Sequence, residues 1–283
     1  MSRWIFLIIT LTSSMAFADT GDKKIVALTW EATEHLLKLN IVPVAVAEAE
    51  EYRRWVVRPK LDATVIDAGL RTEPNLELLI EIEPDLILIS PMLEDMRSQL
   101  ERIAPVKSMA GFSLDRDNYM LQRENFLTLA EELNCIALAK EKLQDLDQKI
   151  STLKEMIQER FANRPPEVTV INLTTPTTVL VYGENSMAQR ALDLLGVKSG
   201  FHIGPSAWGI TQTSVMSLKN INQGIVIYLE PFHYKDVLFN TTFWQSMPFV
   251  QTGRLRSIPA TWSYGGVFSI QYFAEVISAE ILQ

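Results

Sequence analysis

The chain has 283 residues, of which 47% are hydrophobic and 21% charged, and its formal net charge is −8. This apolar fraction excludes a disordered chain, and the acidic balance argues against nucleic acid as a partner because too few cations are present to neutralise phosphates. The chain has one cysteine, Cys135, and three scattered histidines. That composition excludes a disulfide framework and a thiolate metal cluster, and it argues against a His-rich zinc or haem site.

The first eighteen residues have the pattern of a secretory signal peptide. Arg3 supplies a positive n-region, residues 4–11 (WIFLIITL) form an apolar h-region, and residues 16–18 (AFA) fit the small-x-small cleavage rule. The apolar run is too short to span a bilayer, and a buried N-terminal strand is the weaker alternative. We therefore expect cleavage after Ala18, no later membrane-spanning segment, and a periplasmic location.

Short apolar runs and helical patterns alternate along the rest of the chain. The apolar runs are typical of strands buried on both faces of a parallel sheet, and they occupy residues 25–30, 42–48, 84–90, 167–173, 177–183 and 224–230. Helical patterns lie at residues 31–39, 75–82, 118–133 and 185–195, and a last helix follows Gly265 and Gly266. This alternation, once before and once after the middle of the chain, predicts an α/β fold with two α/β lobes.

The middle of the chain has the pattern of one long helix, from about Ala137 to Phe161. Its apolar residues recur at three- and four-residue steps, at Leu143, Leu146, Ile150, Leu153, Ile157 and Phe161. We interpret it as a connecting helix (137–162) between an N-terminal lobe (19–136) and a C-terminal lobe (163–283), with the ligand cleft between the lobes. The pattern alone also fits an ordinary surface helix inside one lobe.

Catalytic signatures are mostly missing from the sequence. It has no Gly-x-Ser-x-Gly elbow, no Walker loop and no His-Glu-x-x-His motif. Cys135 follows a helix end and is best interpreted as a buried structural thiol. We therefore do not expect an enzyme, although an exported hydrolase and a structural subunit or adhesin stay open as alternatives.

Five aromatic residues stand in predicted loops of both halves. Trp30 ends the first strand, Trp55 lies in a polar segment, Trp208 lies in a Gly- and Pro-containing loop, and Trp262 and Tyr264 precede the last helix. Ligands of open α/β sheets bind beyond the carboxyl ends of the strands, where we expect Trp30. Each aromatic taken alone could equally pack in the core, but together they predict an aromatic-walled cleft.

Arg71 stands at a strand-to-helix junction, after residues 63–69 (ATVIDAG). Thr72 can cap the following helix, and Pro74 in its first turn costs no hydrogen bond. The planar guanidinium suits an oxygen-rich ligand and stays charged at any relevant pH. A salt bridge to Glu73 or another nearby carboxylate is an equally good interpretation.

These segments together resemble the periplasmic ferric hydroxamate siderophore-binding proteins of Gram-negative bacteria, the FhuD type of the binding proteins with a helical backbone. The resemblance runs from about residue 24 to residue 275. It is carried by residues 25–48, 51–56, 65–79 (VIDAGLRTEPNLELL), 84–90, 101–105 and 243–266 (FWQSMPFVQTGRLRSIPATWSYGG) and by the Trp208–Gly209 pair.

The resemblance implies two lobes bridged by a long helix, and a monomer that hands a ferric siderophore to an inner-membrane ABC importer. It also implies that Arg71 contacts the hydroxamate oxygens around the iron. The pocket walls it implies are Trp30, Trp55, Trp208, Trp262 and Tyr264. A siderophore already fills all six iron positions, so no protein metal ligand and no cofactor is expected.

Two departures from the family pattern stand out. A pocket tyrosine expected shortly after residues 84–90 is missing, since the chain reads Ser90-Pro91-Met92-Leu93. Glu77 matches one of two importer-docking acids, although it could instead be a solvated helix charge. The second docking acid would fall near Met216, where the chain has none.

The sequence leaves the carrier open. Arg53 and Arg54 beside Trp55 add positive charge, which makes an anionic, citrate-bearing hydroxamate such as aerobactin plausible. Desferrioxamine- and ferrichrome-like carriers are equally compatible. Cobalamin, haem and catecholate siderophores are the alternatives on the same fold.

Overall fold

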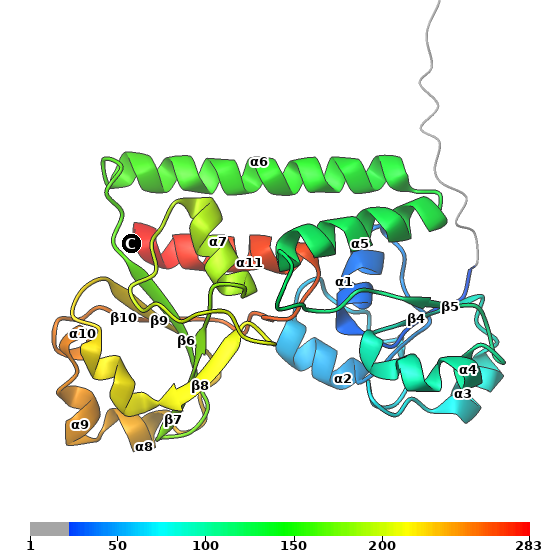
Figure 1. Cartoon of the computed structure of the whole chain (residues 1–283), viewed down its shortest axis with the longest axis horizontal. Helices are drawn as coiled ribbons and strands as arrows, with labels where there is room; N and C mark the ends of the chain where they lie inside the picture. Colours follow the sequence, from blue (N-terminus) through cyan, green and yellow to red (C-terminus); the bar gives the residue numbers. More distant parts are fainter. Residues whose placement is uncertain (1–22) are drawn as a thin grey trace, which may run out of the picture.

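Short runs of Ile, Val, Leu and Ala form two five-stranded sheets in the computed structural model, which describes residues 23–283 (Figure 1). The predicted signal peptide lies outside the described residues. Each sheet is covered by helices, and one long helix, α6, runs along the same side of both lobes (Figure 1). The predicted α/β fold of two lobes joined by a long helix is confirmed.

The first sheet is parallel throughout, with strand order β3-β2-β1-β4-β5. Alternate side chains point to opposite faces, so Val26 and Ile87 enter one core whereas Ile25 and Leu88 enter the other. Helices cover both faces of the sheet, so both faces of its central strands are buried. This burial explains why residues 25–27 and 86–89 are continuous apolar runs. The strands are β1 (Ile25–Ala27), β2 (Ala45–Val46), β3 (Ile66–Asp67), β4 (Leu86–Ile89) and β5 (Val106–Ser108).

The helical segments of the first lobe follow its strands. Leu79, Leu93 and Leu100 cover one face of the sheet, and the helices over residues 30–38 and 118–132 cover the other face. The segments are α1 (Trp30–Lys38), α2 (Ala49–Glu51), the π-helical η1 (Tyr52–Val56), α3 (Leu76–Ile82), the 3₁₀-helical η2 (Pro91–Met96), α4 (Arg97–Leu100) and α5 (Asn118–Glu132).

The long helix α6 (Ile136–Arg160) begins and ends one residue earlier than the pattern predicts. Leu143, Leu146, Ile150, Leu153 and Ile157 are all buried, so the predicted stripe is the face that packs on the protein. The helix packs against α5 as well as against α7 and α11 further along the chain. It therefore contacts elements of both lobes, which an ordinary helix inside one lobe would not do. The residue boundaries between the lobes stay a prediction.

The second sheet is mixed, with strand order β10-β9-β6-β7-β8. Strands β6, β9 and β10 are parallel, whereas β7 is antiparallel to both β6 and β8. The prediction that residues 177–183 join a parallel sheet is therefore wrong, because a short turn returns the chain directly beside β6. The strands are β6 (Val168–Leu173), β7 (Thr178–Tyr182), β8 (Ile210–Ser214), β9 (Ile225–Leu229) and β10 (Leu255–Ile258).

Two longer helices and four short segments complete the second lobe. They are α7 (Met187–Leu195), the 3₁₀-helical η3 (Val215–Asn220), α8 (Lys235–Phe239), α9 (Thr242–Gln245), α10 (Pro248–Gln251) and α11 (Val267–Leu282). The last helix, drawn red in Figure 1, lies below α6 and packs against α1 and α5 as well as α7. Within residues 23–283, no helix is both long and apolar enough to cross a membrane.

The largest apolar core is shared by the two lobes. It includes Val46 and Leu88 of the first sheet, Leu146 of α6, and Val170 and Ile227 of the second sheet. A continuous core of this kind opposes large movements of one lobe against the other, because separating the lobes would expose apolar side chains to water.

A buried polar contact adds to this connection. Glu34 of α1 accepts hydrogen bonds from the backbone N–H groups of Phe268 (2.8 Å) and Ser269 (3.3 Å), and His35 Nε2 accepts one from the Val267 N–H (3.1 Å). The first lobe thus supplies the acceptors for the unpaired N–H groups at the start of α11. Gly266 is required there, because a Cβ would lie 2.3 Å from His35 Nε2.

Candidate functional site

A cavity of about 430 Å³ opens where the carboxyl ends of the first sheet meet loops of the second lobe. This is the position at which open parallel sheets bind ligands, because the loops after neighbouring strands converge there. Its size lies in the range of small-molecule pockets. Its lining comprises Leu28, Thr29, Glu31, Glu48, Arg71, Thr72, Ser90, Met92, Trp208, Trp262 and Tyr264.

Arg71 stands at the tip of a tight turn after β3. The N–H groups of Leu70 and Glu73 each donate to the other residue's carbonyl at 3.2 Å, which closes the turn around Arg71. Gly69 enters the turn with φ of +91°, and a Cβ there would lie 2.9 Å from the Asn75 nitrogen, so glycine is required. The helix cap is Asn75, whose Oδ1 accepts from the Leu78 N–H at 3.1 Å, and the predicted capping by Thr72 is wrong.

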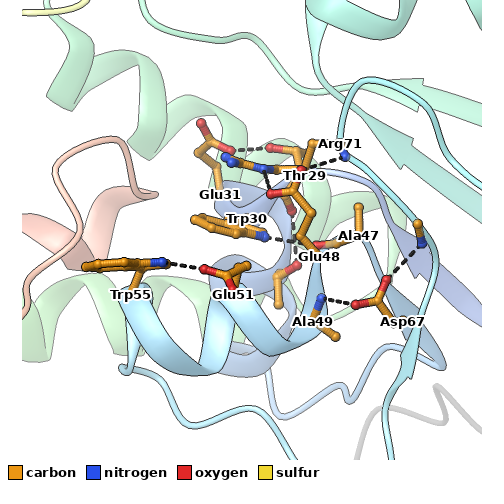
Figure 2. A network of polar contacts seen from close by, with 12 residues as sticks. Thr29, Trp30, Glu31, Ala47, Glu48, Ala49, Glu51, Trp55, Asp67 and Arg71 are labelled. Atoms are coloured by element: carbon orange, nitrogen blue, oxygen red, sulfur yellow. Dashed lines mark hydrogen bonds and ion pairs between the residues drawn. The ribbon is translucent and has the colours of Figure 1, made fainter.

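The Arg71 guanidinium is held on two sides. Its Nε donates to Glu48 Oε2 at 2.8 Å, and its backbone N–H donates to Glu48 Oε1 at 3.2 Å. The guanidinium carbon lies 3.7 Å from the centroid of the Trp30 ring (Figure 2). Stacking and the ion pair fix the plane of the guanidinium. The Nη groups make no hydrogen bond within residues 23–283, so they are available to a ligand oxygen.

The salt-bridge interpretation of Arg71 is therefore confirmed, whereas contact with a ligand stays a prediction. The salt bridge is formed with Glu48, not with Glu73. Glu48 follows β2, and its backbone adopts φ of +52° at the start of α2. Asp67 fixes this junction, because its carboxylate accepts from the N–H groups of Ala49 and Gly69, each at 2.9 Å (Figure 2).

The second lobe supplies an aromatic wall. The ring centroid of Tyr264 lies 5.6 Å from that of Trp262 and 6.0 Å from that of Trp208, in edge-to-face arrangements. Trp208 is 55% exposed, which is high for a tryptophan and places a large apolar face at the rim of the cavity. Burial raises the pKa of Tyr264 to about 12, so its hydroxyl stays protonated and can donate a hydrogen bond.

Trp30 and Trp55 lie outside the lining. Trp30 is the first residue of α1, not the end of the strand, and it is only 2% exposed. Its Nε1 donates to the Ala47 carbonyl at 2.9 Å, and its ring supports Arg71 from below. Trp55 lies in η1 instead of a loop, packs against the shared core and donates through Nε1 to Glu51. Both tryptophans thus lie in helical segments, and neither belongs to the lining of the cavity.

The basic residues next to Trp55 do not add charge to the cavity. Arg53 pairs with Glu50 at 2.6 Å and donates to the carbonyls of Asp62 and Val65. Arg54 is exposed and lies over Trp55, outside the lining. The structure thus removes the reason for favouring an anionic carrier.

Two acidic residues of the cavity are absent from the sequence predictions. Glu48 neutralises Arg71, and Glu31 lies beside them and accepts a hydrogen bond from the Thr29 hydroxyl (Figure 2). Burial raises the pKa of Glu31 above its ordinary value, while the Thr29 hydrogen bond and the Arg71 charge act in the opposite direction. The available signal was a carboxylate shortly after each strand, since Glu31 lies four residues beyond the end of β1 and Glu48 two residues beyond the end of β2.

The remaining candidates lie as follows. Ser90 and Met92 line the cavity where the family tyrosine is missing. Glu77 is exposed in the first turn of α3, and Met216 is 58% exposed in η3. Cys135 is buried, and burial raises the pKa of its thiol, as expected for a structural cysteine.

A second, smaller cavity of about 210 Å³ lies between the N-terminal ends of α5 and α7. Its lining is mainly polar and charged, with Arg116, Asp117, Glu184 and Arg190 among its residues. It contains neither the tryptophans nor Arg71, so the larger cavity is the stronger candidate for an apolar, oxygen-bearing ligand.

Comparison with known proteins agrees with this geometry. The sequence profile of the periplasmic binding protein family matches residues 25–261. The chain belongs to this family. Among its members, the iron(3+)-hydroxamate-binding protein FhuD of Escherichia coli is 36% identical over 266 residues, which cover 93% of this chain and 88% of that protein. A probable siderophore-binding lipoprotein of Bacillus subtilis, YfiY, is 26% identical over 97% of this chain and 88% of its own length.

Among solved structures of this periplasmic binding protein family, FhuD of Vibrio cholerae bound to Fe³⁺–Desferal superposes with a TM-score of 0.88. It is 37% identical, and the match covers 92% of this chain and 98% of that one. Two lobes and a long connecting helix therefore persist where most of the sequence has diverged.

Proposed function

We propose that this chain is a periplasmic carrier that binds ferric hydroxamate siderophores and delivers them to an inner-membrane ABC importer. The observation that carries the proposal is Arg71, which lines a cavity with an aromatic wall and whose Nη groups have no hydrogen-bond partner among residues 23–283. A ferric hydroxamate presents the matching groups, since negatively polarised oxygens surround its iron and a hydrocarbon skeleton surrounds the oxygens.

The relatives support this chemistry. One is named for iron(3+)-hydroxamate binding, and another was crystallised with Fe³⁺–Desferal. In our proposal Arg71 donates to the hydroxamate oxygens, Trp208, Trp262 and Tyr264 hold the skeleton, and Trp30 positions Arg71 without touching the ligand. The siderophore supplies every iron ligand, so the protein acts as a binding protein and not as an enzyme.

Delivery requires export and a docking surface. We propose that the predicted signal peptide is removed after Ala18 and that the monomeric carrier acts in the periplasm. Glu77 stands exposed on α3 and is our candidate for contact with an importer arginine. Met216 offers an apolar contact on the other lobe instead of a second acid.

Tryptophan fluorescence of the mature protein tests the proposal, because a ferric siderophore bound beside Trp208 and Trp262 should quench their emission. Ferric desferrioxamine, ferrichrome, ferric aerobactin and a ferric catecholate serve as ligands, with cobalamin and haem as further arms. We expect saturable, submicromolar quenching by at least one ferric hydroxamate. Arg71→Ala should weaken its binding by about 30-fold, or about 2 kcal/mol for the loss of charged hydrogen bonds.

Arg54→Ala is the matched control, because it removes an exposed arginine outside the cavity. It should bind like the wild type. Quenching by cobalamin, haem or a catecholate alone would refute the proposed ligand class. An Arg71→Ala variant with unchanged affinity would remove Arg71 from the site.

A further inference from the structure

The cavity has an unusual charge balance for a site that receives oxygen-rich ligands. Its lining includes one basic residue, Arg71, and two acidic residues, Glu31 and Glu48. Glu48 already pairs with Arg71 at 2.8 Å, so these two charges largely neutralise each other. Glu31 is the acidic residue that is left without a basic partner in the lining.

Glu31 has no ionic partner in the part of the chain that the structure describes. Its carboxylate accepts a hydrogen bond from the Thr29 hydroxyl, and it forms no ion pair within 4.0 Å among residues 23–283. Arg71 lies near enough to favour the charged form, but its Nε is bonded to Glu48. Burial disfavours the ionised carboxylate, which is why the pKa of Glu31 is raised. A ligand cation placed beside Glu31 would supply the missing counter-charge.

The lining has no second basic side chain, because Arg53 and Arg54 both lie outside it. Arg53 is bonded to Glu50 and to backbone carbonyls, and Arg54 lies outside the cavity. The negative charge of an anionic ligand would therefore lie near Glu31, and the only arginine available to balance it, Arg71, is already paired with Glu48. A carboxylate on the ligand would be repelled by Glu31 or would have to leave it protonated.

We propose that Glu31 is a specificity-determining residue that makes this cleft prefer ferric hydroxamates with a pendant protonated amine over those with a pendant carboxylate. The inference rests on the proposed function, since it concerns the choice among ferric hydroxamates. Figure 2 shows Glu31 beside Arg71. In this proposal the hydroxamate oxygens bind the Nη groups of Arg71, and the pendant group lies beside the carboxylate of Glu31. An opposite charge placed next to Glu31 in this buried site gives a preference of roughly tenfold or more.

One linear trihydroxamate in three forms tests the proposal. Ferric desferrioxamine B carries a pendant ammonium, its N-acetyl derivative is neutral, and its N-succinyl derivative ends in a carboxylate. The iron centre and the skeleton are the same in all three, so their dissociation constants differ through the pendant charge. We expect the wild type to bind the cationic form most tightly and the anionic form at least about tenfold more weakly.

Two variants assign the effect to Glu31. Glu31→Gln should bring the three affinities to within about threefold of one another. Glu81→Gln changes the net charge equally on the exposed side of α3 and should keep the wild-type order. Equal binding of the three forms by the wild type, or an unchanged order in Glu31→Gln, would overturn the inference while leaving ferric hydroxamate binding intact. Failure of all three forms to bind would overturn the inference, and failure of ferrichrome and ferric aerobactin as well would refute the proposed function.

Discussion

The contact between Glu34 and the start of α11 predicts a large loss of stability in Glu34→Ala. Glu34 is fully buried, and its carboxylate accepts from the N–H groups of Phe268 and Ser269 and from the Ser269 hydroxyl at 2.7 Å. Three buried donors would lose their acceptor, at about 1.5 kcal/mol each, so we expect a loss of about 4–5 kcal/mol. Glu34→Gln keeps the shape and one acceptor oxygen and should cost about 1–2 kcal/mol.

The same residue predicts a pH dependence with a defined sign. Burial raises the pKa of Glu34 from its ordinary 4.5 to about 7. Because the folded pKa is the higher one, the folded protein binds the proton more tightly, and this stabilising contribution is complete below pH 4.5. It is lost as the pH rises through 7, by at most about 1.4 kcal/mol per pH unit.

Urea unfolding followed by circular dichroism between pH 4.5 and 8 measures this effect. His35 works in the opposite sense, so the informative quantity is the difference between the wild type and Glu34→Gln. The stability of the wild type should fall relative to that variant as the pH rises towards 7. The exposed control Glu81→Gln should stay parallel to the wild type. Parallel curves for the wild type and Glu34→Gln would refute the reasoning.

Two further substitutions test the same structure. Burial lowers the pKa of His35 to about 3, so the contribution of neutral His35 to the free energy of unfolding is lost as the pH falls from 6.5. In acid unfolding curves the wild type should therefore lose stability relative to His35→Gln. A difference between the two proteins that stays constant with pH would contradict this. Gly69→Ala should cost about 1–2 kcal/mol and weaken ferric hydroxamate binding in the fluorescence titration, because the turn that holds Arg71 must shift. Gly253→Ala, also at positive φ but with no neighbour within 4 Å, is its control, and equal affinities of the two variants would count against the role of the turn.

The ligand-facing edge shows where sequence reasoning was sufficient. The junction of Arg71 was predictable because a largely apolar strand segment, a glycine and a helix start follow one another within a few residues. The aromatic wall of Trp208, Trp262 and Tyr264 was predictable for a similar reason, since glycine and proline mark the loops that carry them. The stripe on α6 was predictable because its period is local.

Other features depended on contacts between residues far apart in the chain. Arg71 pairs with Glu48, 23 residues away, because β2 and β3 are neighbours in the sheet, and no local pattern specifies that order. Trp30 is buried because it begins α1 beneath Arg71, although its sequence position suggested a wall of the cleft.

The sequence by itself determined the α/β composition, the two groups of strands, the connecting helix and the cation at the mouth of the cleft, because each follows from periodicity or turn chemistry within a short segment. Only the tertiary structure decided the charge around that cation. The position of Glu31 beside the Glu48–Arg71 pair arises where three parallel strands end at one edge, and that convergence is a property of sheet order. Electrostatic specificity could therefore be inferred only from the tertiary structure, because it depends on the distances between charges in space and not on their spacing in the chain.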